Sequence, residues 1–157
     1  MRQNILYPDF QDFIRELNKV GVEYLLIGGY SVILHGYHRS TGDLDIWVNQ
    51  TKANFKKLQH AFLNFGLTTV GISESSFMNS VENDVFTFGR SPICIDILTK
   101  VTGLEFEAAF KNSEWFDIQD DLKVRAIRLD DLIATKRAVN RPKDKDDIQN
   151  LKKGKHK

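Results

Sequence analysis

Three aspartates stand in or beside apolar segments that favour β-strands. Asp43 and Asp45 belong to GDLDIWV, and Asp96 belongs to ICIDIL. Residues i and i+2 of a strand point to the same side, so Asp43 and Asp45 present two carboxylates on one face, while Leu44 and Ile46 turn into a core. Carboxylates this close raise each other's pKa, and a hard cation such as Mg²⁺ offsets that cost.

Asp96 interrupts a strand that otherwise has the pattern of a buried one, since Ile95 and Ile97 face the side opposite to it. A buried unpaired charge is costly, which favours a metal or a basic side chain as its partner. If this strand lies beside LDIWV, three carboxylates converge. The two aspartates of the D-x-D also have a purely structural explanation. Turns are rich in aspartate, so Asp43 could belong to the turn TGD and Asp45 to the edge of the strand.

A glycine pair and a basic turn precede these aspartates. Gly28 and Gly29 end the apolar run VEYLLI, where a backbone without Cβ atoms can turn sharply and approach a ligand. A short helix after them would aim its first amides and the Ser31 hydroxyl at an anion. Arg39 and Thr41 add a cation and a hydroxyl that suit phosphate oxygens. The pattern is neither a P-loop nor a dinucleotide motif, and an ordinary turn also accounts for the glycine pair.

Together these features resemble the nucleotidyltransferase superfamily, which has the DNA polymerase β-like fold. The matching stretch is IGGYSVILHGYHRSTGDLDIW. The later segment LDDLIATKRAVNRPKDKDDIQNL resembles the C-terminal element of minimal and antibiotic-type members, including the abortive-infection (AbiEii-like) toxin branch. The resemblance extends from about Tyr24 to Leu151.

The resemblance implies an enzyme that transfers a nucleoside monophosphate from an NTP, with ATP as one candidate, to an acceptor hydroxyl. Asp43 and Asp45 would ligate Mg²⁺, and Asp96 would complete a catalytic triad around two ions. The acceptor is a small antibiotic-like molecule, a protein or tRNA. Nucleotide binding is assigned to a set of glycines, hydroxyls and cations: Gly28, Gly29, Ser31, Arg39, Thr41, Lys136 and Lys143. A solvated position on a helix explains the two lysines about as well.

Other functions and further residues stay open. The alternative is a nucleotide-binding module with little or no turnover, such as a toxin–antitoxin component with an antitoxin partner, and a homodimer is possible. A D-x-D glycosyltransferase would leave the glycine pair unexplained. Trp47 either lines the nucleotide site or belongs to the core. Asp144 and Asp147 also resemble positions of the C-terminal motif, although helix capping explains Asp144 nearly as well.

Composition is that of an ordinary globular domain, with 157 residues, 41% hydrophobic and 27% charged. No apolar run approaches the roughly 20 residues that span a bilayer, and the first residues lack the apolar region of a secretory signal, so we expect a cytoplasmic protein without a membrane partner.

The single cysteine, Cys94, excludes an internal disulfide and is expected in the core. Residues 136–157 carry nine Lys or Arg against three Asp, a basic end that is either a solvated tail or a phosphate-holding surface.

The pattern of apolar residues predicts an α+β (α/β mixed) fold, with a mixed sheet of about five strands flanked by helices. By the resemblance, residues 1–128 would form the nucleotidyltransferase core, and residues 129–157 a helical C-terminal element of the same domain. Asp9 is expected to cap the first helix and Gly21 to end it. Helices are expected at 9–20, 51–66, 104–111, 129–140 and 143–153, with a short helix or turn at 30–36. Strand-like segments occupy 22–27, 44–48, 67–72, 84–89, 93–98 and 122–127.

Overall fold

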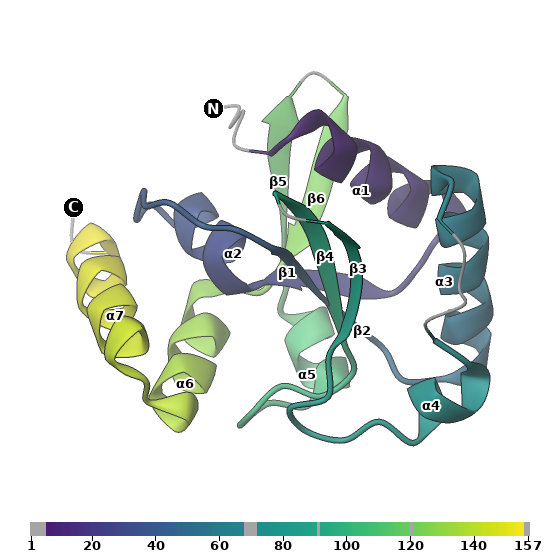
Figure 1. Ribbon diagram of the computed structural model, residues 1–157. Helices are drawn as coiled ribbons and strands as arrows, with labels where there is room; N and C mark the ends of the chain where they lie inside the picture. The colour runs from purple at the N-terminus through teal and green to yellow at the C-terminus, as the bar shows by residue number, and fades with distance from the viewer. Residues whose placement is uncertain (1–5, 68–71, 91, 120, 156–157) are drawn as a thin grey trace.

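The computed structural model describes residues 6–67, 72–90, 92–119 and 121–155 (Figure 1). Its elements follow one another along the chain as α1 (Pro8–Val20), β1 (Tyr24–Ile27), α2 (Gly28–Leu34), β2 (Leu44–Val48), α3 (Lys52–Phe65), α4 (Glu74–Met78), β3 (Phe86–Arg90), β4 (Ile93–Leu98), α5 (Phe106–Lys111), β5 (Glu114–Gln119), β6 (Leu122–Ala126), α6 (Leu129–Val139) and α7 (Pro142–Lys155).

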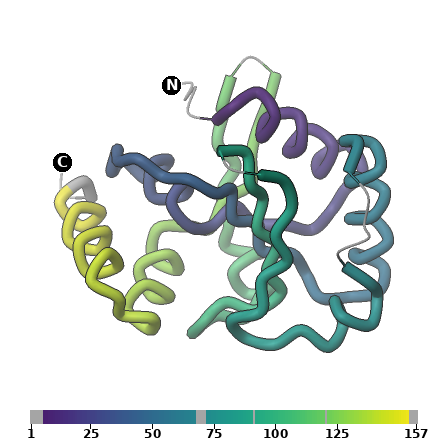
Figure 2. The backbone as a smooth tube through the Cα atoms, viewed as in Figure 1, coloured from purple at the N-terminus to yellow at the C-terminus, as the bar shows by residue number. Residues whose placement is uncertain are grey.

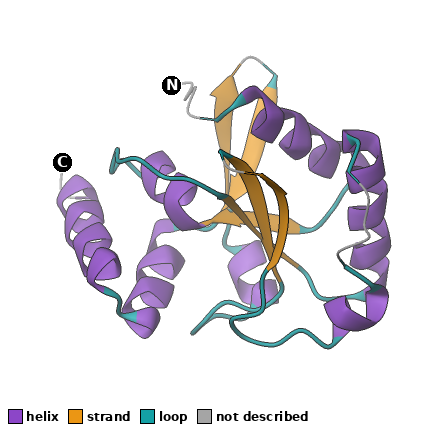
Figure 3. Ribbon diagram, viewed as in Figure 1, coloured by secondary structure: helices purple, strands orange, loops and turns teal. Residues whose placement is uncertain are grey.

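The strands form one mixed sheet of six strands in the order β3-β4-β2-β1-β6-β5 (Figure 3). The pairs β2–β4 and β1–β6 are parallel, whereas β1–β2 and the hairpins β3–β4 and β5–β6 are antiparallel. This arrangement confirms the predicted α+β class. The edge strand β5 was not predicted, because EWFDIQ carries two acidic residues and leaves Trp115 exposed, which hides its alternation.

Each face of the sheet has its own apolar core. In β1, Tyr24 and Leu26 pack into the core beneath α1, α3 and α4, while Leu25 and Ile27 pack into a second core with α5, α6 and α7. Both kinds of side chain are buried, which explains the uninterrupted apolar run of this central strand. Figure 1 shows α1 and α3 together at one end of the molecule and α6 with α7 at the other.

The helix ends follow the predicted signals with one exception. Gly21 and Gly66 end α1 and α3 with φ of 84° and 96°, the left-handed conformation that glycine adopts most easily. Asp9 is not the cap of α1. The cap position is Tyr7, because Pro8 takes the first helical position and leaves Asp9 within the first turn.

Other differences are local. The segment at 30–36 is helical and begins earlier, at Gly28. Helix α4 was not predicted and is capped by Ser73 in a capping box. The strand expected at 67–72 falls mainly on residues 68–71, which lie outside the described residues. No helix in the described part of the chain is long and apolar enough to cross a membrane.

Candidate active site

Sheet register brings Asp45 and Asp96 side by side. They are Cα partners in the parallel pair β2–β4, and Asp43 lies just before β2 at an exposed position. Leu44 and Ile46, which alternate with these aspartates, are fully buried in the opposite core. The alternation of β2 therefore turns the carboxylate of Asp45 toward the face that carries α6.

The three carboxyl groups interact with one another. Burial raises the pKa of Asp45 to about 7, with further contributions from the charges of Asp96 and Asp43 and from a hydrogen bond to Asp96. Asp43 is exposed, but partial loss of water around its carboxyl group, followed by a hydrogen bond to Asp96 and the charge of Asp96, also raises its pKa. Asp96 accepts a hydrogen bond of 2.7 Å from the hydroxyl of Thr87, its cross-strand partner on β3. Thr87 was missed, although its place between Phe86 and Phe88 in DVFTFG marks the polar face of that strand.

The chemistry of these groups fits a divalent cation. Among the described residues, none of Asp43, Asp45 and Asp96 forms an ion pair with Lys or Arg, so no cation in direct contact offsets their mutual repulsion. Carboxylate oxygens are the ligands that Mg²⁺ takes. Within the described ranges, no three Asp, Glu, His or Cys side chains are grouped as a ready-made metal site. One cation shared by all three aspartates therefore requires their side chains to turn.

The glycine pair makes room for neighbouring side chains. Gly28 has φ of 70°, and a Cβ at this position would overlap the carboxylate of Asp45. A Cβ at Gly29 would overlap the hydroxyl of Thr41. The first contact follows from the pairing of β1 with β2, which places Ile27, the residue before Gly28, opposite Asp45. Glycine at both positions thus lets the polar side chains of β2 and the preceding loop pack directly on the backbone.

Ser31 has a structural contact. Its side chain is fully buried, and its hydroxyl donates a hydrogen bond of 2.6 Å to the carbonyl oxygen of Gly28. The hydroxyl therefore supports the turn between β1 and α2.

A buried cluster of charges connects α6 and α7. Lys136 is only 6% exposed, and its Nζ lies 2.9 Å from Asp147 and 3.3 Å from Asp144. Asp144 also accepts hydrogen bonds from one edge of the Arg141 guanidinium, Nε at 2.7 Å and Nη2 at 3.0 Å, and from the Arg141 backbone N–H at 3.0 Å. Asp144 thus lies within the first turn of α7 and not at its cap position, and it accepts a hydrogen bond from the backbone N–H of the residue before the helix in addition to its ion pairs. Arg39, from the loop before β2, completes this charge cluster by pairing with Asp147.

The predicted nucleotide-binding cations therefore differ in environment. Lys136 and Arg39 are engaged by carboxylates of α7, whereas Lys143 is exposed on the same helix. The positive charge of Lys143 lowers the pKa of Asp45, opposing the larger effect of burial. Of these three cations, Lys143 is the one whose charge acts on Asp45.

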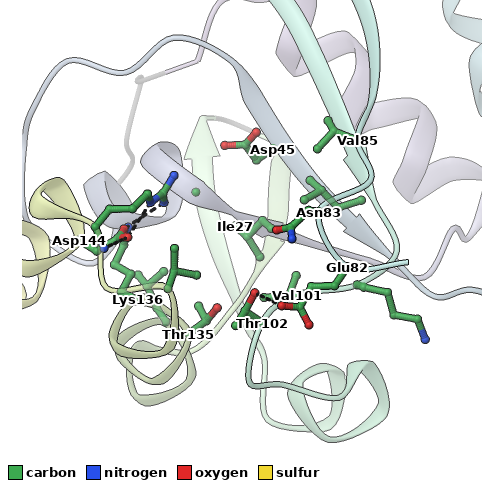
Figure 4. Close-up of a pocket in the computed structure, with 16 residues that line it drawn as sticks. Ile27, Asp45, Glu82, Asn83, Val85, Val101, Thr102, Thr135, Lys136 and Asp144 are labelled. Carbon is green, nitrogen blue, oxygen red and sulfur yellow. Dashed lines mark hydrogen bonds and ion pairs between the residues drawn. The ribbon is translucent and has the colours of Figure 1, made fainter. Parts of the chain in front are cut away.

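A cleft of about 290 Å³ runs from Asp45 and Gly28 to the buried charge cluster (Figure 4). Its walls come from the ends of β1, β2 and β4, the loops around 82–85 and 100–102, and α6. The lining is a mixture of apolar and polar side chains that includes Ile27, Asn83, Val85, Leu98, Thr102 and Thr135. Such a cleft, apolar with a few polar groups and a carboxylate of raised pKa at one end, has the composition of a small-molecule site.

Of two further residues beside the site, Trp47 takes the core position that the sequence left open, whereas Cys94 lies elsewhere than predicted. Trp47 is a core residue: it is 1% exposed, packs edge-on against Phe106, and donates from Nε1 to the Thr99 carbonyl. Cys94 is only partly buried, and burial together with the charges of Asp43 and Asp96 raises its thiol pKa. It alternates with Ile95 on the carboxylate side of β4, so the expected core position is wrong.

A glycine turn followed by aspartates on two neighbouring strands of a mixed sheet is the arrangement of the nucleotidyltransferase fold. A family model described as "Nucleotidyltransferase of unknown function (DUF6036)" matches residues 9–153. The chain belongs to this family, which confirms the resemblance to the nucleotidyltransferase superfamily. The comparison with curated proteins gives no match. The AbiEii-like branch stays a prediction.

Proposed function

We propose that this protein is an Mg²⁺-dependent nucleotidyltransferase that moves a nucleoside monophosphate from an NTP to an acceptor hydroxyl. The observation that carries the proposal is the pairing of Asp45 with Asp96 across β2 and β4, with Asp45 lining the cleft and no Lys or Arg of the described residues in an ion pair with either carboxylate. A structural role alone gives no reason to keep such a repulsive pair beside a cavity.

Asp43, Asp45 and Asp96 would hold the metal, which supplies charge neutralisation for the phosphates and a lowered pKa for the attacking hydroxyl when it is bound. Asp96 is the residue that we assign to orienting the acceptor hydroxyl, since its neighbour Thr87 already fixes one of its oxygens. The backbone at Gly28 and Gly29, with Thr41 against it, would receive the triphosphate. Lys143 would add a cation from α7.

A binding module without turnover is the second candidate. It is favoured by the absence, within the described residues, of a group of three ligands ready for a metal. In this case the protein would bind an NTP and present it to a partner, such as the other component of a toxin–antitoxin pair.

The test combines binding with transfer. Purified protein is titrated with each of the four NTPs, with and without Mg²⁺, while its melting temperature is followed. It is then incubated with Mg²⁺, α-labelled NTP and a bacterial lysate that is separated into protein, RNA and small molecules. We expect Mg²⁺-dependent stabilisation by an NTP and label in one fraction, both lost in Asp45→Asn.

Each result separates the two candidates. The labelled fraction would identify the acceptor class. Stabilisation without any label transfer would favour the binding module over the enzyme. If neither the melting temperature nor the label responded to any NTP, both proposals would be wrong.

A further inference from the structure

Arg39 lies beside the glycine pair with one edge of its guanidinium held by Asp147. Its Nε donates to Oδ1 of Asp147 at 2.8 Å, and its Nη2 donates to Oδ2 at 3.0 Å. The other nitrogen, Nη1, lies 3.4 Å from the position of a Cβ built on Gly29. A two-point pair of this kind fixes the plane and direction of the guanidinium, which a single contact cannot do.

This edge-on pairing leaves the guanidinium able to bind a further anion. Arginine has five N–H donors, and in the described part of the chain Arg39 uses three, two on Asp147 and one on the Ser40 carbonyl at 3.0 Å. The remaining donors belong to Nη1 and Nη2. The end of the side chain that faces Gly29 therefore retains donor capacity.

Asp147 is itself firmly held. Its side chain is 1% exposed, and its Oδ2 also forms an ion pair with Nζ of Lys136 at 2.9 Å. The preceding residue, Asp146, accepts a hydrogen bond of 2.8 Å from the hydroxyl of Tyr37. Two consecutive residues of α7 thus clamp the loop between α2 and β2, which runs from the sheet toward α7 in Figure 2.

We propose that Asp147 is a positioning residue for nucleotide binding: it aims Arg39 so that the free guanidinium N–H groups meet the NTP phosphates beside Gly28 and Gly29. The inference rests on the proposed function, because it needs a nucleotide in this site. It adds a dependence of the phosphate site on α7, which follows it by more than a hundred residues along the chain.

The inference makes a prediction opposite to that of simple electrostatics. Removing a carboxylate near a triphosphate removes repulsion, so a role as a mere charge predicts tighter NTP binding in Asp147→Asn. A positioning role predicts weaker binding, because Arg39 loses its fixed direction. Likewise, Arg39→Lys keeps the positive charge but loses the planar group that donates two parallel hydrogen bonds. This variant weakens binding only if the orientation of the guanidinium matters.

The experiment measures the Kd of a non-hydrolysable NTP analogue with Mg²⁺ by calorimetry. We expect Asp147→Asn and Arg39→Lys each to raise Kd about tenfold, as loss of an oriented charge-assisted contact does. Asp147→Glu should bind more tightly than Asp147→Asn. The control is Asp117→Asn, which removes the same charge from an exposed position on β5 and leaves the loop that carries Arg39 unchanged, and its Kd should stay within about twofold.

A double variant separates positioning from a general loss of structure. Asp147→Asn added to Arg39→Lys should raise Kd little further, because both changes remove the same orientation. If wild-type protein binds the analogue and Asp147→Asn binds it equally or more tightly, the inference is overturned while the proposed function stands. Should Asp147→Asn fail to fold, unchanged affinity in Arg39→Lys would overturn the inference. If wild-type protein binds none of the analogues, the proposed function fails, and the inference with it.

Discussion

At the scale of single residues, the site is organised by repulsion and by tight backbone contacts. Asp45 and Asp96 are held together by strand register, and the pKa of Asp45 rises to about 7, mainly through burial and then through the charge of Asp96. Gly28 and Gly29 have no room for a side chain, since a Cβ on Gly28 would overlap Asp45 and a Cβ on Gly29 would overlap Thr41.

The carboxylate repulsion predicts a gain in stability for Asp96→Asn that depends on pH. The pKa of Asp45 rises from 3.8 in the unfolded chain to about 7 in the folded protein, so the folded state binds the proton more tightly. The contribution of Asp45 to the free energy of unfolding therefore falls as pH rises from 3.8 to about 7. Asp96→Asn should raise the free energy of unfolding by about 1 kcal/mol at pH 8 and by little at pH 4.

Urea denaturation at both pH values measures this difference. Asp117→Asn, which changes an exposed carboxylate on β5, serves as the control and should show no such pH-dependent gain. A variant at Asp96 that is less stable than wild type at pH 8 would contradict the account.

The glycine contacts predict a large effect of one added methyl group. Gly29→Ala should lower the free energy of unfolding by about 1–3 kcal/mol, because the new Cβ overlaps Thr41. Adding Thr41→Gly should recover part of the loss. Gly42→Ala is the control, since a Cβ there meets no atom within 4 Å, and it should change stability by less than about 0.5 kcal/mol. Equal losses at both glycines in thermal melts would count against the contact.

At the scale of elements, sequence patterns predicted the pieces of the site better than their connections. The strand face of Asp45 and the strand nature of ICIDIL followed from alternation, and their convergence needed only that β4 lie beside β2. The pairing of Arg39 with Asp147 could not be predicted from the sequence, because 108 residues separate them and no periodic pattern links a loop to a later helix. Ser31 and Lys136 were assigned to a ligand by type, while their contacts within the protein depend on the fold.

The junction of α6 and α7 predicts a loss of stability in acid. Burial acts to raise the pKa of Asp144, but hydrogen bonds from Arg141 and the charge of Lys136 outweigh it and lower the pKa to about 2. The stabilisation is therefore complete above the unfolded value of 3.8 and is lost as pH falls toward 2. Asp144→Asn should cost about 2 kcal/mol at pH 6 and progressively less below pH 4.

Unfolding of Asp144→Asn and wild type across this pH range checks the prediction. Asp146→Asn, an exposed carboxylate two residues further along α7, should cost much less at every pH. A cost for Asp144→Asn that is the same at pH 6 and pH 2.5 would show that its charge has no part in the junction.

At the scale of the whole molecule, the helical C-terminal element completes one of the two cores. Leu132, Ile133 and Leu151 pack in the same cluster as Ile27 and Trp47 of the sheet. Without α6 and α7, these sheet residues would be exposed to water, and one wall of the cleft would be missing.

We therefore predict that a chain truncated after Arg128 does not fold on its own. Circular dichroism should show no cooperative melt, in contrast to the full chain. The packing contributed by several buried side chains of α6 and α7 is lost, at about 2–5 kcal/mol each, and the sum is comparable to the whole stability of a typical domain, about 5–15 kcal/mol. A truncated chain that melts cooperatively at the wild-type temperature would mean that residues 1–128 are an independent domain.

The central claim is that the cleft beside Asp45 and Asp96 transfers a nucleoside monophosphate. The most direct measurement incubates the protein, Mg²⁺ and lysate acceptors in parallel with α-labelled and γ-labelled forms of the same NTP. The account predicts that the α-label enters an acceptor and the γ-label leaves as pyrophosphate, with both events abolished in Asp45→Asn. Transfer of the γ-label to the acceptor, or α-label transfer that persists in Asp45→Asn, would contradict it.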